Sequence, residues 1–206
     1  MPGTVWSAPV PILNRTSYTV AAATLGTAAP YDISPAQVIL FPPQLNEGTR
    51  VRLLAHGSYT ATGTTTSLTW GFYMTAASTA TVANPLVATS AVLGVSPATV
   101  VAAVTGIPWV AEYWGRISSV SAPGTSLTNA QIVGRGRLTV GSSLTAFATP
   151  VPIPQTLAAI AVNQTASPGF GMVTNIAQLV SVGVTVTTGT NFTSITTDEL
   201  TCELLG

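Results

Sequence analysis

Strict alternation of apolar and polar positions dominates residues 47–74 and predicts two long β-strands. A period of two belongs to a sheet and not to a helix. The apolar face carries Val51, Leu53, Ala55 and Tyr59 in the first run and Leu68, Trp70, Phe72 and Met74 in the second. Residues 62–64, Thr-Gly-Thr, lie between the runs and supply a glycine that can take positive φ. Such a loop is typical of a hairpin, so we expect one β-hairpin here, at the middle of the fold.

Shorter apolar or alternating runs predict the remaining strands. They are residues 17–21, 37–41, 81–89, 91–95, 107–120, 131–140, 156–162, 176–186 and 195–204. Over residues 96–104 a helical turn is an alternative, because Ser96 precedes Pro97 at a suitable first helical position, although the β-branched content favours a strand. Strands at this spacing, with no long helical stretch, predict an all-β sandwich or barrel.

One predicted strand carries a glycine stripe. Gly134 and Gly136 are two residues apart and therefore share a face of the strand over residues 131–140. Glycine in a strand often marks a close approach of another group to the backbone. We expect a large side chain, Trp109 or Tyr113, to lie against this stripe.

The chain divides into an arm and a single domain. Four prolines among small residues make residues 1–30 an extended N-terminal arm, in which only residues 17–21 look like a strand. Neither an internal repeat nor a linker splits the rest. We therefore expect one antiparallel β-sandwich over residues 31–206, with about 8–10 strands.

The composition is unusually poor in charge. Hydrophobic residues make up 47% of the chain and charged residues 6%, where about 25% is ordinary. Six arginines balance six acidic residues, and lysine is absent. A neutral chain without lysine is a poor candidate for binding nucleic acid. A nearly uncharged monomer is also poorly protected against association, so we expect other subunits to cover part of its exterior.

Membrane and secretion signals are also missing from the sequence. No window reaches about 18 consecutive apolar residues, so we expect no membrane span. The first residues lack a cationic region followed by an apolar core, so we expect no signal peptide. The single cysteine, Cys202, cannot form an intrachain disulfide and is interpreted as a small buried thiol.

Candidate chemistry is sparse. His56 is the single histidine, and its predicted mid-strand position favours a structural role over a catalytic one. A zinc site wants about four Cys and His ligands, and the chain holds two such residues. Asp198 and Glu199 are adjacent in a predicted strand and should point to opposite faces, which excludes an acid–base pair. We expect no enzyme activity, no cofactor and no metal site.

The charged residues nevertheless show a pattern, because pairs of them share a face in three predicted strands. They are Arg50 and Arg52 in one strand, Glu112 and Arg116 in another, and Arg135 and Arg137 in a third. One interpretation is cross-strand ion pairs on a solvated face, worth about 0.2–1 kcal/mol each. The other is a subunit interface, in which bidentate Arg–carboxylate pairs fix orientation. We favour the interface, since the surface otherwise has little to set its register.

Several short Gly- and Thr-rich motifs carry a family resemblance. In order, they are Arg50-Val51-Arg52, Ala55-His56-Gly57-Ser58-Tyr59, Thr62-Gly63, Leu68-Thr69-Trp70-Gly71, Pro108-Trp109 with Glu112, Gly124-Thr125 and Val133-Gly134-Arg135-Gly136-Arg137-Leu138-Thr139-Val140. Together they resemble a family of tailed-bacteriophage capsid decoration and minor head proteins. The chain departs from the family pattern at Ser118, where an arginine is expected, and has Arg116 two residues earlier on the same face. No individual ion pair is therefore carried over from the family.

The resemblance implies a jelly-roll-like virion structural protein that decorates or cements the capsid, often as a homotrimer. Its partners would be further copies of itself and the major capsid protein, and its place the capsid exterior after synthesis in the host cytoplasm. One alternative is a receptor- or glycan-binding module of a phage fibre, which an exposed Tyr113 or Trp114 would favour. Another is the shell-forming coat subunit, which would usually carry a basic arm, whereas residues 1–30 hold only Arg15.

Overall fold

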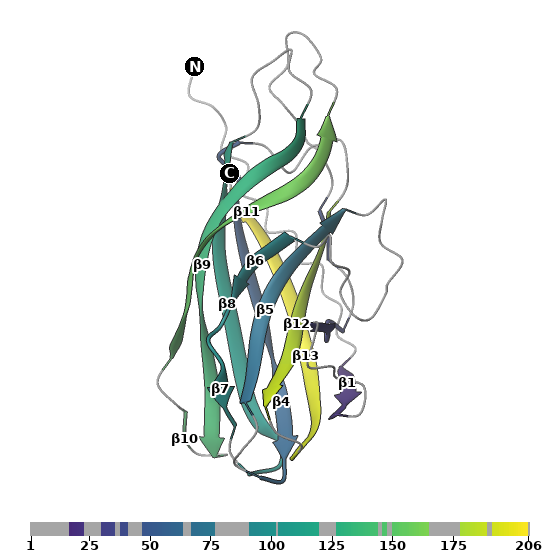
Figure 1. Ribbon diagram of the computed structural model, residues 1–206, viewed down its shortest axis with the longest axis vertical. Helices are drawn as coiled ribbons and strands as arrows, with labels where there is room; N and C mark the ends of the chain where they lie inside the picture. The colour runs from purple at the N-terminus through teal and green to yellow at the C-terminus, as the bar shows by residue number, and fades with distance from the viewer. Residues whose placement is uncertain are drawn as a thin grey trace.

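The protein folds as two antiparallel β-sheets that face each other in a sandwich-like arrangement (Figure 1). The computed structural model describes residues 17–22, 30–35, 38–40, 47–63, 67–76, 91–101, 103–119, 127–143, 146–147, 150–164, 178–188 and 191–205. Thirteen strands and no α-helix are found among these residues. The predicted all-β class is thereby confirmed, whereas the predicted number of about 8–10 strands is too low, since three strands have only two residues each, at 31–32, 99–100 and 146–147.

The larger sheet has seven strands in the order β1-β13-β4-β8-β9-β10, and β11 also pairs with β9. Its strands are β1 (Tyr18–Ala21), β4 (Arg50–Ala61), β8 (Ile107–Ser119), β9 (Leu127–Ser143), β10 (Ala146–Phe147), β11 (Val151–Gln164) and β13 (Phe192–Leu205). The last strand of the chain thus lies between the first strand and β4. Long-range pairing of this kind brings residues of both chain halves onto one sheet.

The smaller sheet has six strands in the order β2-β12-β5-β6, with β3 on β12 and β7 on β5. Its strands are β2 (Tyr31–Asp32), β3 (Val38–Leu40), β5 (Ser67–Ala76), β6 (Ala91–Val95), β7 (Thr99–Val100) and β12 (Gln178–Thr188). The longest pairing in this sheet joins β5 to β12 over almost their full lengths.

The predicted hairpin over residues 47–74 is wrong. Its two arms are β4 and β5, which lie in different sheets: β4 pairs with β8 and β13, and β5 pairs with β12, β6 and β7. Each arm carries a heavily apolar face. In a sandwich two such faces are buried by opposing each other across the core, not by pairing edge to edge. The connection that follows Gly63 therefore carries the chain from one sheet to the other.

Most of the other predicted strands are present. The runs at residues 17–21, 37–41, 91–95, 107–120, 131–140, 156–162, 176–186 and 195–204 correspond to β1, β3, β6, β8, β9, β11, β12 and β13. The alternative helical turn over residues 96–104 is wrong, because residues 99–100 form β7, in keeping with their β-branched side chains. The predicted strand at 81–89, and residues 1–16 and 23–29 of the predicted arm, lie outside the described residues.

Aromatic side chains from β5 and β8 fill the space between the sheets. The ring centroids of Trp70 and Trp109 are 6.2 Å apart, and those of Phe72 and Tyr113 are 6.1 Å apart. All four side chains are almost completely buried. The apolar face predicted for β5, with Trp70 and Phe72, is therefore buried as expected, even though the predicted partner of β5 is wrong.

Tyr113 lies against the glycine stripe of β9, as predicted. A Cβ atom added at Gly134 would overlap the phenol ring and hydroxyl of Tyr113, and one added at Gly115 would lie 2.7 Å from the Cε1 of the same ring. Gly136 has a different neighbour, the backbone carbonyl of Glu112. Burial raises the pKa of the Tyr113 hydroxyl. The ring therefore fills a slot that only glycine leaves open.

Candidate functional site

Five of the six arginines lie on the outer face of the larger sheet, and the sixth lies outside the described part of the chain. Intervening residues such as Val51, Leu53 and Leu138 are buried. Because side chains alternate along a strand, the arginines of β4, β8 and β9 point away from the core. They are Arg50, Arg52, Arg116, Arg135 and Arg137. A chain with so few charges thus concentrates its cations on one face.

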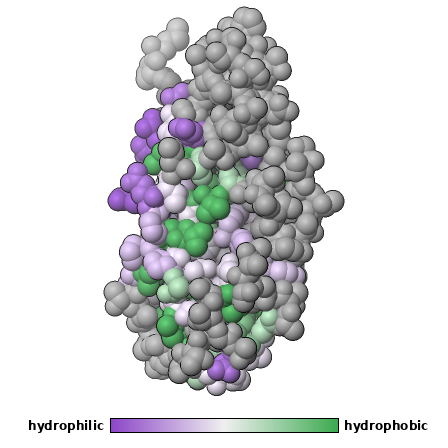
Figure 2. All heavy atoms as spheres, viewed as in Figure 1, coloured by the Kyte–Doolittle hydropathy of each residue, from purple (hydrophilic) through white to green (hydrophobic). Residues whose placement is uncertain are grey.

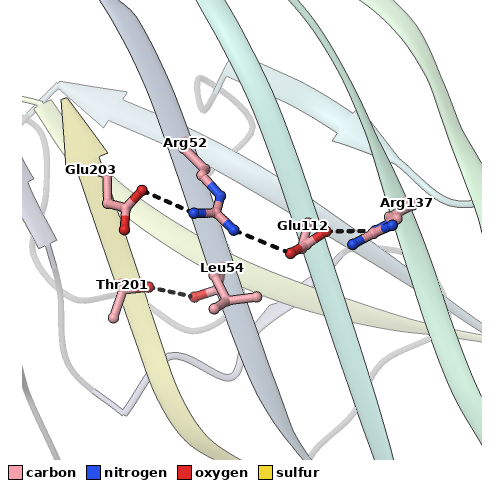
Figure 3. Close-up of polar contacts among 6 residues, drawn as sticks. All are labelled: Arg52, Leu54, Glu112, Arg137, Thr201 and Glu203. Atoms are coloured by element: carbon pink, nitrogen blue, oxygen red, sulfur yellow. Dashed lines mark hydrogen bonds and ion pairs between the residues drawn. The ribbon is translucent and has the colours of Figure 1, made fainter. Parts of the chain in front are cut away.

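Four charged side chains on this face form a continuous row across four strands (Figure 3). Arg52 of β4 donates to Glu203 of β13 at 3.1 Å and to Glu112 of β8 at 3.5 Å. Arg137 of β9 donates from Nε to the other oxygen of Glu112 at 2.5 Å. The side chain of Glu112 is only 9% exposed. The row contains two cations and two anions and is electrically balanced.

The register of the strands produces this row. Glu203 lies opposite Arg52 in the β13–β4 pairing, and Arg137 lies opposite Glu112 in the β8–β9 pairing. The cross-strand ion pairs expected for Arg52, Glu112 and Arg137 are therefore present, whereas their role in a subunit interface stays a prediction. The sequence interpretation missed Glu203. Finding it would have required the pairing of β4 with the last strand of the chain, which no local pattern indicates.

Replacing Glu112 by Gln should lower the free energy of unfolding by about 1–3 kcal/mol, since two charge-assisted hydrogen bonds lose their acceptor charge at a nearly buried position. Glu203→Gln is the matched control, because it also removes a partner of Arg52 but is 39% exposed. We expect the control to cost less than about 1 kcal/mol. Urea unfolding of both variants measures the difference. Equal losses of unfolding free energy in the two variants would mean that the burial of Glu112 does not strengthen its ion pairs.

A second polar contact joins β4 and β13 on the same face. His56 and Glu199 lie opposite each other in register, with Nε2 and Oε2 3.2 Å apart. The adjacent Asp198 accepts a hydrogen bond from Ser17 at 2.9 Å. The prediction that Asp198 and Glu199 point to opposite faces is wrong. The register shifts between Thr197 and Glu199, and the alternation of buried positions is interrupted there, so that neither Asp198 nor Glu199 is buried. A β-bulge of this kind places two successive residues against one partner.

The other three arginines take no part in the ion pairs found among the described residues. Arg50, Arg116 and Arg135 come from three adjacent strands and are exposed. With Trp114 they line an open hollow of about 310 Å³ on the outer face. Trp114 is 39% exposed, and the guanidinium of Arg137 lies 5.6 Å from its ring centroid. The six predicted site residues thus fall into two neighbouring groups: three belong to the charged row, which Glu203 balances, and three are the arginines of the hollow.

The opposite side of the sandwich has a different character. Figure 2 shows apolar residues over β6 in the middle of the visible face and hydrophilic residues along the edge formed by β9 and β11. Val92 of β6 and Val100 of β7 are 44% and 65% exposed. These two strands pair with β5 in the smaller sheet. The two most exposed large apolar side chains of the described residues therefore lie on the smaller sheet, whereas the exposed arginines lie on the larger one.

The described residues offer little for metal or redox chemistry. Within them, no three His, Cys, Asp or Glu side chains lie close enough to hold a metal ion. Cys202 is buried, and burial, aided by the charge of Glu203, raises the pKa of its thiol to about 12.

No helix in the described part of the chain is long and apolar enough to cross a membrane.

Comparison of the whole chain with protein-family models, with curated proteins and with solved structures finds no match.

Proposed function

We propose that the chain is a structural protein of a tailed-bacteriophage virion that decorates or cements the capsid. In this proposal the sandwich is jelly-roll-like, residues 1–30 form an extended arm, and three copies associate on the capsid exterior. Its partners are further copies of the chain and the major capsid protein of the same virion. A cement protein acts by burying surface across capsomer junctions, so that many contacts must break together.

The observation that carries this proposal is the concentration of arginines on one outer sheet face of a chain that is 6% charged. A charged row with fixed register, such as Arg52 with Glu112 and Glu203, can orient one subunit against another. The exposed valines of β6 and β7 supply apolar surface on the other sheet. The sequence motifs between residues 50 and 140 that resemble phage head proteins supply the biological setting.

The first test is the solution mass of the purified chain by light scattering at neutral pH. We expect a mass of about three chains at micromolar concentration, because an uncharged exterior favours association. The same measurement in a dilution series separates a stable trimer from weak self-association. A monomer at every concentration would contradict the trimeric role and would favour the fibre-module alternative.

The second test is addition of the purified protein to capsids prepared without it. We expect it to co-sediment with the capsids and to raise the temperature at which they release DNA, since each bound copy stabilises the assembled state by mass action. The matched control is the same protein unfolded and carboxymethylated at Cys202. Failure of the folded protein to co-sediment would contradict the capsid role, whatever its oligomeric state.

A further inference from the structure

The hollow beside the charged row has a specific chemical lining. Three arginines line it, together with Trp114 of β8 and Gln155 of β11; the arginines are Arg50 of β4, Arg116 of β8 and Arg135 of β9. Among the residues that the structure describes, no carboxylate lines this hollow. Its polar side chains are therefore hydrogen-bond donors, apart from the single carbonyl of Gln155.

The strand register places the three arginines at neighbouring positions of one sheet face. Arg50 lies opposite Arg116 in the β4–β8 pairing, and Arg135 lies opposite Trp114 in the β8–β9 pairing. Neighbouring strands are about 4.8 Å apart, and like charges placed opposite one another are unfavourable. Glu112, two residues before Trp114 on β8, is already held by Arg52 and Arg137. An anion from outside the chain would relieve this repulsion.

The number of donors favours a tetrahedral oxyanion over a carboxylate. A carboxylate carries one charge and two oxygens, whereas a phosphate monoester carries about −1.5 to −2 charges and three free oxygens near neutral pH. Arginine is suited to bidentate contacts with such groups and keeps its charge at any physiological pH. Three guanidinium groups around one hollow match the three free oxygens of a phosphate or sulfate ester better than the two of a carboxylate, and a phosphate ester also supplies more charge.

The hollow also has room for more than a bare ion. Its volume of about 310 Å³ lies at the lower end of small-molecule sites, about 300–1,000 Å³. Trp114 is partly exposed there, and the cation–π contact with Arg137 holds its ring in place. Such a ring presents a rigid apolar surface next to the three charges.

We propose that this hollow binds a phosphate or sulfate ester carried on a sugar ring. The guanidinium groups of Arg50, Arg116 and Arg135 hold the ester oxygens, and the sugar ring lies against Trp114. The inference goes beyond the capsid role and does not require it, because a free subunit carries the complete hollow and the three arginines of the hollow lie outside the charged row that the proposed function uses to orient subunits. Small sugar esters and charged polysaccharides share this chemistry.

Titration with glucose-6-phosphate, followed by calorimetry and by tryptophan fluorescence, tests the proposal on the full-length protein. We expect saturable binding that weakens about tenfold in Arg116→Gln, since one charged donor group is lost from an exposed position that the fold does not need. Arg52→Gln is the matched control. It removes the same charge from the same sheet face but lies outside the hollow, so its affinity should stay within about twofold of the native value. A thermal melt verifies that both variants are folded.

The ligand series separates the possible sources of the ester. Glucose-6-sulfate and dextran sulfate should compete with glucose-6-phosphate, while glucose and uncharged dextran should not. Tighter binding of dextran sulfate than of the monomer would support a polysaccharide source, and equal binding would support a small sugar ester.

Four results would overturn the proposal. They are no binding of any charged sugar at millimolar concentration, equal binding of glucose, equal binding of inorganic phosphate, and an unchanged affinity in Arg116→Gln. Tighter binding of a single-stranded oligonucleotide than of dextran sulfate would overturn the sugar assignment as well. None of these results bears on the solution mass or on co-sedimentation with capsids, so failure of this inference is distinguishable from failure of the capsid role.

Discussion

Trp109→Ala should lower the free energy of unfolding by about 3–5 kcal/mol, the largest loss we expect from a single core truncation in this chain. Trp109 is 1% exposed and packs against Trp70 from the opposite sheet. Its indole Nε1 also donates to the carbonyl of Thr196 at 3.3 Å. Truncation would leave a cavity at the contact between the sheets and an unpaired carbonyl.

Trp114→Ala is the control for this prediction. It removes the same side chain from the same strand, but Trp114 points outward and is 39% exposed. We expect it to cost less than about 1 kcal/mol, as most surface substitutions do. Urea unfolding monitored by circular dichroism compares the two variants without relying on tryptophan fluorescence. Similar losses for both would contradict the assignment of Trp109 to the core.

The sequence predicted which faces of the strands are buried better than it predicted which strands pair. Alternation correctly placed Leu53 and Trp70 on buried faces, because burial on one face requires a period of two whatever the partner strand is. The same alternation suggested that β4 and β5 form a hairpin. Two successive strands that each carry an apolar face can either pair as a hairpin or lie in opposite sheets. The residues at 62–64 are compatible with both arrangements. Only the global pairing with β12 and β13 decides between them.

The candidate site was also predicted only in part. The alternation of side chains along each strand was enough to group Arg52, Glu112 and Arg137 with other charged residues of their strands. The structure joins these three residues in one row. Glu203 could not be assigned to it, since its strand is about 150 residues away and reaches β4 only through the closed fold. Asp198 and Glu199 show the converse limit. The alternation of side chains predicted the wrong faces there because a bulge inserts one extra residue. A bulge has no reliable sequence signal when the partner strand is unknown.

Gly134→Ala should lower the free energy of unfolding by about 2–3 kcal/mol, although alanine has the better intrinsic strand propensity. The new methyl group would overlap the ring and hydroxyl of Tyr113. Tyr113 is 0% exposed and packs against Phe72, so its ring has no free space into which it could move. Arg135→Ala is the control, because it changes the next residue of β9 on the outward face. We expect the control to stay within about 0.5 kcal/mol of the native protein.

A double-mutant cycle with Tyr113→Leu tests whether the clash with this ring causes the loss. Tyr113→Leu alone should be destabilising by about 2–4 kcal/mol through the cavity that it leaves. With the ring gone, the methyl group of Gly134→Ala would occupy part of that cavity, so the double variant should be more stable than the sum of the single losses by about 1–3 kcal/mol. Additive losses would mean that Gly134 is required for a backbone reason independent of Tyr113. A positive coupling would instead show that the glycine stripe of β9 and the tyrosine of β8 form one packing unit. Gly134 and its partner Gly115 also line the hollow with their backbones. The packing of Tyr113 against these two glycines would therefore hold the backbone of the hollow in place.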